Sequence, residues 1–237
     1  MPPLVPLTDH IWLYPRDPNP ERIQPNVGII VAGRQTILVD AGNSPRIARR
    51  ILLALDEIHA PPVSAVIYTH HHWDHVFGGM VFDAPAVAHE ICRKHLAEMA
   101  AKPWSQAYIQ EEIMRAPARE QGLRGMARAV DDWRSFRIAL PEITLSKTLR
   151  LYGDGLTIEI EHIGGQHAPD SLIVRVPEAR VMFVADAYYP PPPHQGRPDD
   201  TLDHKMIERL AGENMELYID GHGDPLGLEE FRRLAVE

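Results

Sequence analysis

The segment Thr69–His75, which reads Thr-His-His-His-Trp-Asp-His, limits the possible folds of this chain more than any other feature. It directly follows Val63–Tyr68, an apolar run with the length and composition of a buried strand. His70 and His72 are two residues apart, so in an extended segment their side chains lie on one side and can chelate one ion. The aspartate and last histidine of the segment follow at a turn and can hold a second ion. The pattern predicts a metal-binding loop at the end of a strand.

The composition supports this interpretation of the histidines. The chain has 237 residues, thirteen histidines and a single cysteine, Cys92, so its metal site must use histidine and carboxylate ligands rather than paired thiolates. A solvated histidine run without function is the alternative, but four ligand-type residues in six positions after a strand favour a site. His71 has the opposite parity in this segment and is left out of the predicted ligands.

Three more ligand-type residues lie just beyond other predicted strands. His167 is in a turn between two strands, Asp186 follows the apolar run Val181–Ala185, and His222 follows the run Glu216–Ile219. Loops that follow strands gather at one rim of a sheet and commonly carry functional residues. We therefore expect these three side chains to meet the histidine loop at one rim.

The order of the predicted elements indicates a layered α/β protein. Short β-like runs surround an amphipathic helix at Pro45–Ile58, and a second β-rich half ends in a closing helix at Leu226–Val236. Residues 90–140 between the two halves are rich in Ala, Arg, Glu and Met and are predicted to be helical. This stretch is either a cap or insertion, or a set of ordinary outer helices.

These motifs, in this order, resemble the metallo-β-lactamase superfamily over about Val27 to Gly223. The run Leu38–Gly42 is similar to the first motif of the family. Seven side chains match the ligand positions of the family: His70, His72, Asp74, His75, His167, Asp186 and His222. The resemblance implies one domain over residues 1–237, an αββα sandwich with the metals at one edge of its two sheets and a helical insertion near residues 90–140.

The resemblance also implies a role for each ligand. One metal is expected to bind His70, His72 and His167. The second is expected to bind Asp74, His75 and His222, with Asp186 bridging the two. Asp40 is expected to orient a ligand imidazole from behind, and the alternative is that it caps the helix after Gly42. The resemblance implies two divalent metal ions. Because the ligand atoms are nitrogen and oxygen only, zinc is the expected metal, and iron and manganese are left open.

The chemistry implied by the resemblance is hydrolysis, in which a hydroxide that bridges the metals attacks an ester-like carbonyl. Asp74 and Tyr189 are the expected catalytic side chains. Tyr189 stands three residues after Asp186, as in the acyl-homoserine lactonase branch, where the phenol hydrogen-bonds the substrate carbonyl. The neighbouring Tyr188 is a second candidate for this contact, and both rings can instead pack at the rim. His194, after the stiff run Pro190–Pro193, is a further candidate for contact with substrate.

A lactone or thioester is the predicted substrate, ahead of a β-lactam. Asp186 stands where the commonest β-lactamase subclass has cysteine, although Gly165–Ser171 looks more like the third motif of true β-lactamases. A phosphodiesterase or nuclease on the same metals is a second alternative, which the net charge of −9 disfavours. A non-catalytic metal-binding protein is the third, and the complete ligand set argues against it.

The helical stretch has its own two interpretations. Its large side chains can line an apolar pocket for an acyl group, or they can form an ordinary helical core. The candidates are Met99, Trp104, Tyr108, Met114, Met126 and Trp133.

The predicted partner is a small-molecule substrate, with no nucleic acid and no membrane; a homodimer is left open. The first residues lack the basic and apolar regions of a secretory signal, and no apolar run approaches the ~18–20 residues of a membrane-spanning helix. The default expectation is a cytoplasmic protein, although a chain whose signal had been removed would look the same.

Overall fold

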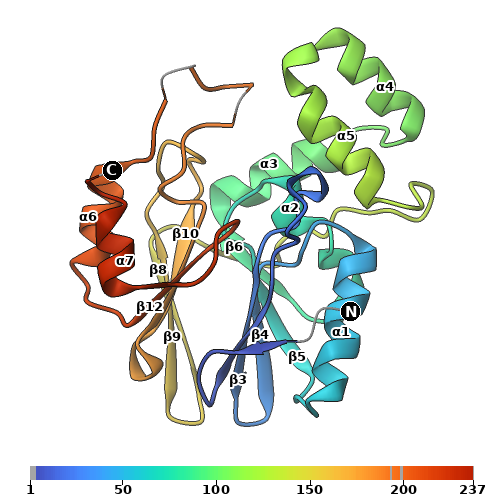
Figure 1. Cartoon of the computed structure of the whole chain (residues 1–237). Helices are drawn as coiled ribbons and strands as arrows, with labels where there is room; N and C mark the ends of the chain where they lie inside the picture. Colours follow the sequence, from blue (N-terminus) through green and yellow to red (C-terminus); the bar gives the residue numbers. More distant parts are fainter. Residues whose placement is uncertain (1–3, 193, 198–199, 237) are drawn as a thin grey trace.

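The structure, a computed structural model, describes residues 4–192, 194–197 and 200–236. Pro193, the last residue of the predicted run Pro190–Pro193, therefore lies outside the described residues. Two β-sheets pack face to face, with α6 and α7 on one outer side and α1 on the other (Figure 1). The predicted αββα sandwich is confirmed.

The first sheet is built from the N-terminal part of the chain, and its strands lie side by side in sequence order. The strands from β4 to β7 run parallel to one another, so their carboxyl ends share one edge. In order they are β1 (Val5–Pro6), β2 (Ile11–Tyr14), β3 (Val27–Ala32), β4 (Gln35–Val39), β5 (Val63–Ile67), β6 (Ala86–His89) and β7 (Ile143–Leu145).

The second sheet is built from the C-terminal part, in the order β13-β12-β11-β10-β9-β8. Its strands are β8 (Thr148–Gly153), β9 (Leu156–His162), β10 (Leu172–Val176), β11 (Val181–Ala185), β12 (Leu217–Asp220) and β13 (Leu226–Gly227). β11 and β12 are parallel, so the residues that follow them also emerge at one edge. The predicted closing helix Leu226–Val236 is shorter than expected, because Leu226 and Gly227 pair with β12.

Helix α1 begins at a capping residue. Ser44 accepts the N–H of Ile47 and Pro45 occupies the first turn of α1, as the Ser-Pro pair predicts. The helices are α1 (Pro45–Glu57), α2 (Trp73–Val76), α3 (Glu90–Ala100), α4 (Gln106–Arg115), α5 (Glu120–Ala129), α6 (His204–Ala211) and α7 (Leu228–Arg233). Four short 3-10 turns are η1 (Pro20–Arg22), η2 (Gly79–Val81), η3 (Pro117–Arg119) and η4 (Pro177–Ala179).

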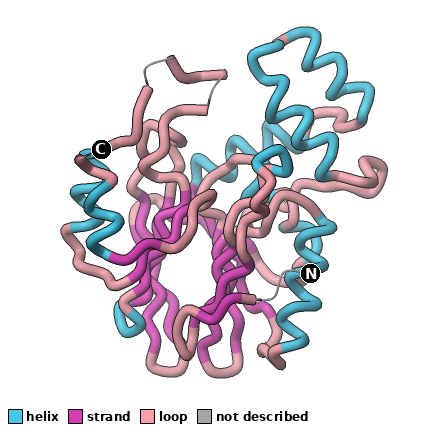
Figure 2. Tube along the Cα trace, viewed as in Figure 1, coloured by secondary structure: helices cyan, strands magenta, loops and turns pink. Residues whose placement is uncertain are grey.

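The interior consists of three apolar layers. The central one lies between the sheets and contains Ile30, Ile67, Val174 and Phe183, and Figure 2 shows the strands gathered there between the helices. The other two layers fill the space between each sheet and its helices. Because the inner strands are covered on both faces, they are continuous apolar runs rather than alternating ones.

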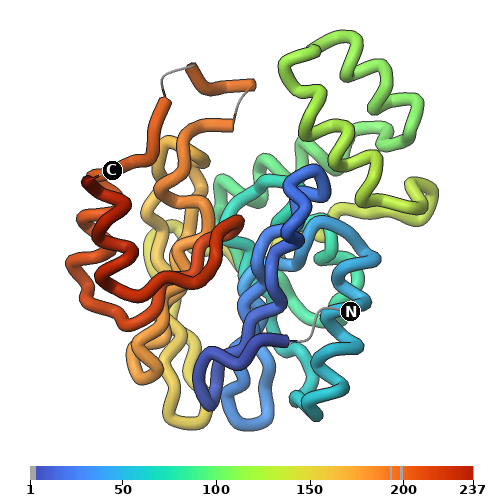
Figure 3. Tube along the Cα trace, viewed as in Figure 1, coloured from blue at the N-terminus to red at the C-terminus, as the bar shows by residue number. Residues whose placement is uncertain are grey.

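The helical stretch predicted near residues 90–140 divides into two parts. Helix α3 packs beside β6 and β7, whereas α4 and α5 project from the sandwich on the side of the long connection between β11 and α6 (Figure 3). We call residues 101–130 the insertion. Among the residues that the structure describes, no helix is both long and apolar enough to cross a bilayer.

His89, the N-cap residue of α3, offers a test of stability against pH. The Nδ1 of His89 accepts the N–H of Ile91 at 3.2 Å, and its ring stacks on His162 with centroids 3.7 Å apart. Burial and the neighbouring His162 lower the pKa of His89, outweighing the opposite effects of Glu90 and Asp170. The pKa of His89 is therefore lower in the folded protein than the value of about 6.5 in the unfolded chain. The contribution of His89 to stability is intact above about pH 6.5 and is lost as the pH falls toward the pKa of the folded state.

His89→Asn keeps an acceptor for the N–H of Ile91 but does not titrate. We expect the Tm of metal-free His89→Asn to fall less than that of the wild type between about pH 7 and about pH 5. Thermal unfolding in the presence of chelator measures this, with His10→Asn as the control for losing one histidine. Equal falls in His89→Asn and the wild type would exclude His89 as a source of acid sensitivity.

Candidate metal centre

The predicted site residues come together at the edge where strands of both sheets end. The segment Thr69–His75 follows β5, and Asp40 follows the neighbouring parallel strand β4. In the second sheet, Asp186 directly follows β11 and His222 follows β12. The parallel pairing within each sheet therefore brings residues far apart in sequence to one rim.

Three ring nitrogens form the first group. The Nε2 of His70 lies 2.9 Å from the Nδ1 of His72, which lies 3.0 Å from the Nε2 of His167. The Nδ1 of His167 lies 2.8 Å from the carbonyl oxygen of Pro190, so its proton belongs on Nδ1 and leaves a lone pair on Nε2. The three nitrogens are a group whose ligand atoms all lie within 4.8 Å of one another.

Two carboxylates and two imidazoles form the second group. The Oδ2 of Asp74 lies 3.4 Å from the Nε2 of His75 and 3.2 Å from the Nε2 of His222. The Oδ2 of Asp186 lies 3.4 Å and 3.5 Å from the same two nitrogens. Ligand atoms around a tetrahedral zinc ion are about 3.3 Å apart, given bond lengths near 2.0–2.1 Å. These spacings suit a divalent metal.

Asp186 belongs to both groups. Its Oδ2 lies 3.2 Å from the Nε2 of His167 in the first group and faces His75 and His222 in the second. Gly221 leaves room for it, because a Cβ at that position would lie 2.0 Å from the Oδ1 of Asp186. One carboxylate thus lies between two clusters of ligand-type atoms.

The polar atoms at the centre fit a bound cation. The Nε2 of His75 and the Oδ1 of Asp186 are buried and have no hydrogen-bond partner among the described residues. Burial lowers the pKa of His70, and lowers that of His72 to about 3, so both imidazoles are neutral. Burial alone would raise the pKa of Asp186, but the imidazoles of His222 and His75 outweigh it and hold that pKa well below its ordinary value. Neutral imidazole and ionised carboxylate are the forms that bind metal. At the other three histidines the carboxylates outweigh burial: Asp40 raises the pKa of His75, and Asp186 raises the pKa of His167 and that of His222, so a metal would displace a proton from each.

Asp40 lies directly behind these ligands. Its Oδ2 is 2.7 Å from the Nδ1 of His75, and its Oδ1 accepts the backbone N–H of Thr69 at 2.8 Å. The hydroxyl of Thr69 donates to Asp40 and lies 3.1 Å from the Nδ1 of His70. Asp40 therefore orients His75 directly and His70 through Thr69, leaving the Nε2 of each free for a metal. The alternative cap role is wrong, because Ser44 caps α1.

A cleft of about 440 Å³ opens over the two groups. Its floor contains His72, Asp74, His167, Asp186 and His222. Its walls come from the loop before β3, the insertion and the loop after β11. The described wall residues are Arg16, Asp17, Pro18, Pro20, Ile23, Gln24, Trp73, Ala118, Arg119, Gln121, Gly122, Leu123, Met126, Tyr189, Pro192 and His194.

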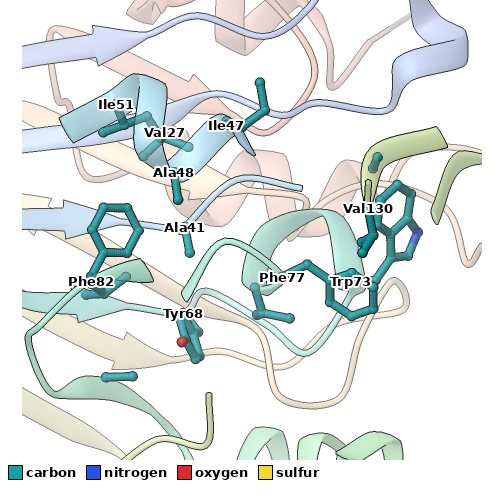
Figure 4. Close-up of a cluster of buried hydrophobic side chains, with 14 of the residues drawn as sticks. Val27, Ala41, Ile47, Ala48, Ile51, Tyr68, Trp73, Phe77, Phe82 and Val130 are labelled. Carbon is teal, nitrogen blue, oxygen red and sulfur yellow. The ribbon is translucent and has the colours of Figure 1, made fainter. Parts of the chain in front are cut away.

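The insertion is fixed to the ligand loop through Trp73. This buried indole lies beside Phe77 and Val130 in the apolar cluster below the loop (Figure 4). Gly125 of α5 packs against it so closely that a Cβ there would lie 3.0 Å from the Cζ2 of Trp73. The side chain between His72 and Asp74 thus anchors α5 at the cleft.

The insertion contributes to the cleft differently from the prediction. Of the six large side chains proposed as a pocket lining, Met126 lines the cleft and the other five do not. Trp104 and Trp133 stack on each other with centroids 5.8 Å apart and pack against the core, and Met114 is 76% exposed. The acyl-pocket interpretation therefore fails for these five side chains, and the helical-core interpretation holds for Met99, Trp104 and Trp133, which pack against the core.

The two tyrosines differ in their surroundings. Tyr189 lines the cleft, with its ring centroid 6.1 Å from that of His167 and 6.2 Å from that of His222. The hydroxyl of Tyr188 is buried and donates to the Oδ2 of Asp220, so the structure does not bring Tyr188 to the cleft. Burial, and then the charge of Asp220, raises the pKa of both phenols, which therefore stay protonated.

Two other residues complete the comparison with the sequence. His194 lines the cleft, as its proposed contact with substrate requires. His71 lies outside both ligand groups, as its parity predicts, and its Nδ1 lies 2.8 Å from the Oδ1 of Asp170. Asp170 is fully buried and was not singled out in the sequence, because nothing in its spacing signals a partner 99 positions away.

The sequence matches the model of the metallo-β-lactamase superfamily over residues 20–224. The chain belongs to this family, as its motifs predict.

Among curated proteins, the chain is 28% identical over 199 residues to 2,4-dinitroanisole O-demethylase subunit alpha of Nocardioides sp. (82% of this chain, 51% of the relative). It is 24% identical over 183 residues to linear primary-alkylsulfatase of Pseudomonas sp. (67% and 32%). The chain thus spans about half the length of the first relative and a third of the second.

Solved structures share the fold at low sequence identity. The inverting sec-alkylsulfatase Pisa1 of Pseudomonas sp. matches with a TM-score of 0.69 at 19% identity, over 99% of this chain and 40% of that chain. A metallo-β-lactamase of Pontibacter korlensis matches with a TM-score of 0.63 at 16% identity, over 99% and 98%. These likenesses support the fold.

Proposed function

We propose that the chain is a hydrolase that uses two divalent metal ions to cleave an ester-like bond in a small molecule. Zinc is the metal that we expect first. The observation that carries this proposal is the pair of ligand groups that share the Oδ2 of Asp186. His70, His72 and His167 would hold one ion, and Asp74, His75 and His222 the other. The donors are nitrogen and oxygen only, which suits zinc and leaves iron and manganese as alternatives.

When bound, such a metal pair lowers the pKa of a water toward neutrality and polarises the oxygen of a substrate. The protein itself fixes the geometry. Asp40 and the carbonyl of Pro190 hold the protons of His75 and His167 on Nδ1, which keeps each Nε2 available as a ligand. Asp74 places a carboxylate on the cleft floor, and Tyr189 lines the same cleft, where its phenol would donate a hydrogen bond to a substrate.

The cleft favours a small and partly apolar substrate. Its volume of about 440 Å³ is in the range of small-molecule sites. Ile23, Leu123 and Met126 give it an apolar wall. A lactone or a thioester fits this arrangement, because its carbonyl can lie at the ligand groups while its apolar part contacts that wall. Among the described lining residues only Arg16 and Arg119 are basic, which is few for a nuclease.

Cleavage of a sulfate ester is a second candidate. It is favoured by the likeness to two proteins named as alkylsulfatases, one in sequence and one in structure. A sulfate ester with an alkyl chain also combines an anionic group for the metals with an apolar part for the wall.

A panel of substrates on zinc-loaded protein tests the proposal. It contains a lactone, a thioester, an alkyl sulfate, a chromogenic cephalosporin and an aryl phosphodiester. We expect the highest kcat/KM on the lactone or the thioester, at least about tenfold above the cephalosporin and the phosphodiester, since one well-placed contact is worth about that factor. Preference for the alkyl sulfate would establish the second candidate. Two bound metals without turnover on any member would indicate a metal-binding protein.

A further inference from the structure

The wall of the cleft carries a positive charge that the proposed reaction does not use. Arg119 is the last residue of η3, and its side chain lines the cleft. Arg16 lines the cleft from the loop before β3; its Nη2 pairs with the Oδ1 of Asp224 at 3.1 Å, and its buried Nε has no partner among the described residues. Beyond the proposed ligands Asp74 and Asp186, the one carboxylate in the described lining is Asp17.

The existing ion pairs leave this charge only partly neutralised. The Nη1 of Arg119 is 3.5 Å from the Oε2 of Glu112, but the Oε1 of Glu112 is already held by Arg115 at 2.7 Å. One carboxylate thus serves two guanidinium groups. Asp17 is paired with Arg22 at 2.9 Å. An added anion would therefore meet an unneutralised guanidinium.

A second donor lies close to Arg119 in the described lining. His194 lines the same cleft from the loop after β11. Burial lowers the pKa of His194, and the charge of the guanidinium of Arg119, which lines the same cleft, lowers it further. His194 is therefore neutral near pH 7 and keeps one N–H to donate, while the guanidinium of Arg119 has donors only. An oxyanion between them would accept from both.

We propose that this wall of the cleft is a subsite for an anionic group of the substrate, a carboxylate or similar oxyanion, with Arg119 as its main contact. The anionic group is separate from the bond that is cleaved. This rests on the proposed function in placing the cleaved bond at the two ligand groups. The expected substrate is then an ester-like compound in which an apolar part separates the bond that is cleaved from an anionic group. Charge-assisted contacts to a guanidinium provide the selection for that anion.

Arg119→Ala and Arg115→Ala form a matched pair of variants. Both remove a guanidinium from Glu112, but only Arg119 lines the cleft. The measurement is the preference between two thioesters that differ only at the far end of the acyl chain, a carboxylate in one and a primary amide in the other. We expect the wild type and Arg115→Ala to prefer the carboxylate, and Arg119→Ala to lose about tenfold or more of that preference.

Three results would overturn the subsite: no preference in the wild type, an unchanged preference in Arg119→Ala, or an equal loss in Arg115→Ala. If neither thioester is hydrolysed, the proposed carbonyl hydrolysis fails, and a binding measurement decides on the subsite separately. Calorimetry then compares 6-phenylhexanoate with its amide on zinc-loaded wild type and both variants. Loss of affinity for the carboxylate in Arg119→Ala alone supports the subsite, and equal affinity in all three proteins refutes it.

Discussion

Asp186→Ala is expected to abolish hydrolysis and to lower the bound metal from two ions per chain to one or none. The Oδ2 of Asp186 is the atom common to the two ligand groups, within 3.2–3.5 Å of His167, His75 and His222. Without it the second group keeps one carboxylate, and the two groups share no ligand. Because Lewis-acid stabilisation is worth several kcal/mol, we expect kcat/KM to fall by about a thousandfold or more.

Metal analysis by mass spectrometry and steady-state kinetics measure the two effects. Asp83→Ala, at an exposed position after η2, is the control for losing one carboxylate outside the cleft. Thermal unfolding of the metal-free proteins shows whether Asp186→Ala still folds. A variant that keeps two metals and most of its activity would refute the shared-ligand role of Asp186.

The ligand groups could be predicted from the sequence because each part depends on local rules. His70 and His72 share a side of an extended segment, and Asp186 and His222 each follow an apolar strand. Once the strands pair in parallel, these ends must meet. The roles of the individual ligands came from the family resemblance, and the structure groups the same atoms.

The walls of the cleft could not be predicted, because they depend on how separate segments dock. Helix α5 is held over the cleft by Gly125 against Trp73 and by Arg128, whose Nη2 donates to the carbonyl of Glu21 at 3.0 Å. Neither contact has a periodic signal in the sequence. Arg16 and Arg119 therefore reach the cleft without any pattern that marks them, while Trp104 has an aromatic signal and packs in the core.

Asp40→Asn is expected to weaken metal binding about ten- to a hundredfold while leaving the fold intact. Asp40 accepts hydrogen bonds from the backbone and hydroxyl of Thr69 and faces the Nδ1 of His75. Asparagine has only one oxygen, so its amide group must face one of these donors. If it faces His75, the imidazole proton moves to Nε2 and that nitrogen can no longer bind a metal.

Competition with a chromophoric chelator measures the affinity, and Asp40→Ala separates orientation of the ligand from backbone strain. Asp40 has φ 70°, in the left-handed region that asparagine tolerates and alanine does not favour. Asp40→Ala should therefore lose both metal affinity and thermal stability, whereas Asp40→Asn should lose mainly affinity. Asp203→Asn, at the N-cap of α6, is the matched control, because asparagine caps a helix as well as aspartate does. Wild-type affinity in Asp40→Asn would show that the hydrogen bond behind His75 does not set its tautomer, and the orientation of the second ligand group would then depend on packing alone.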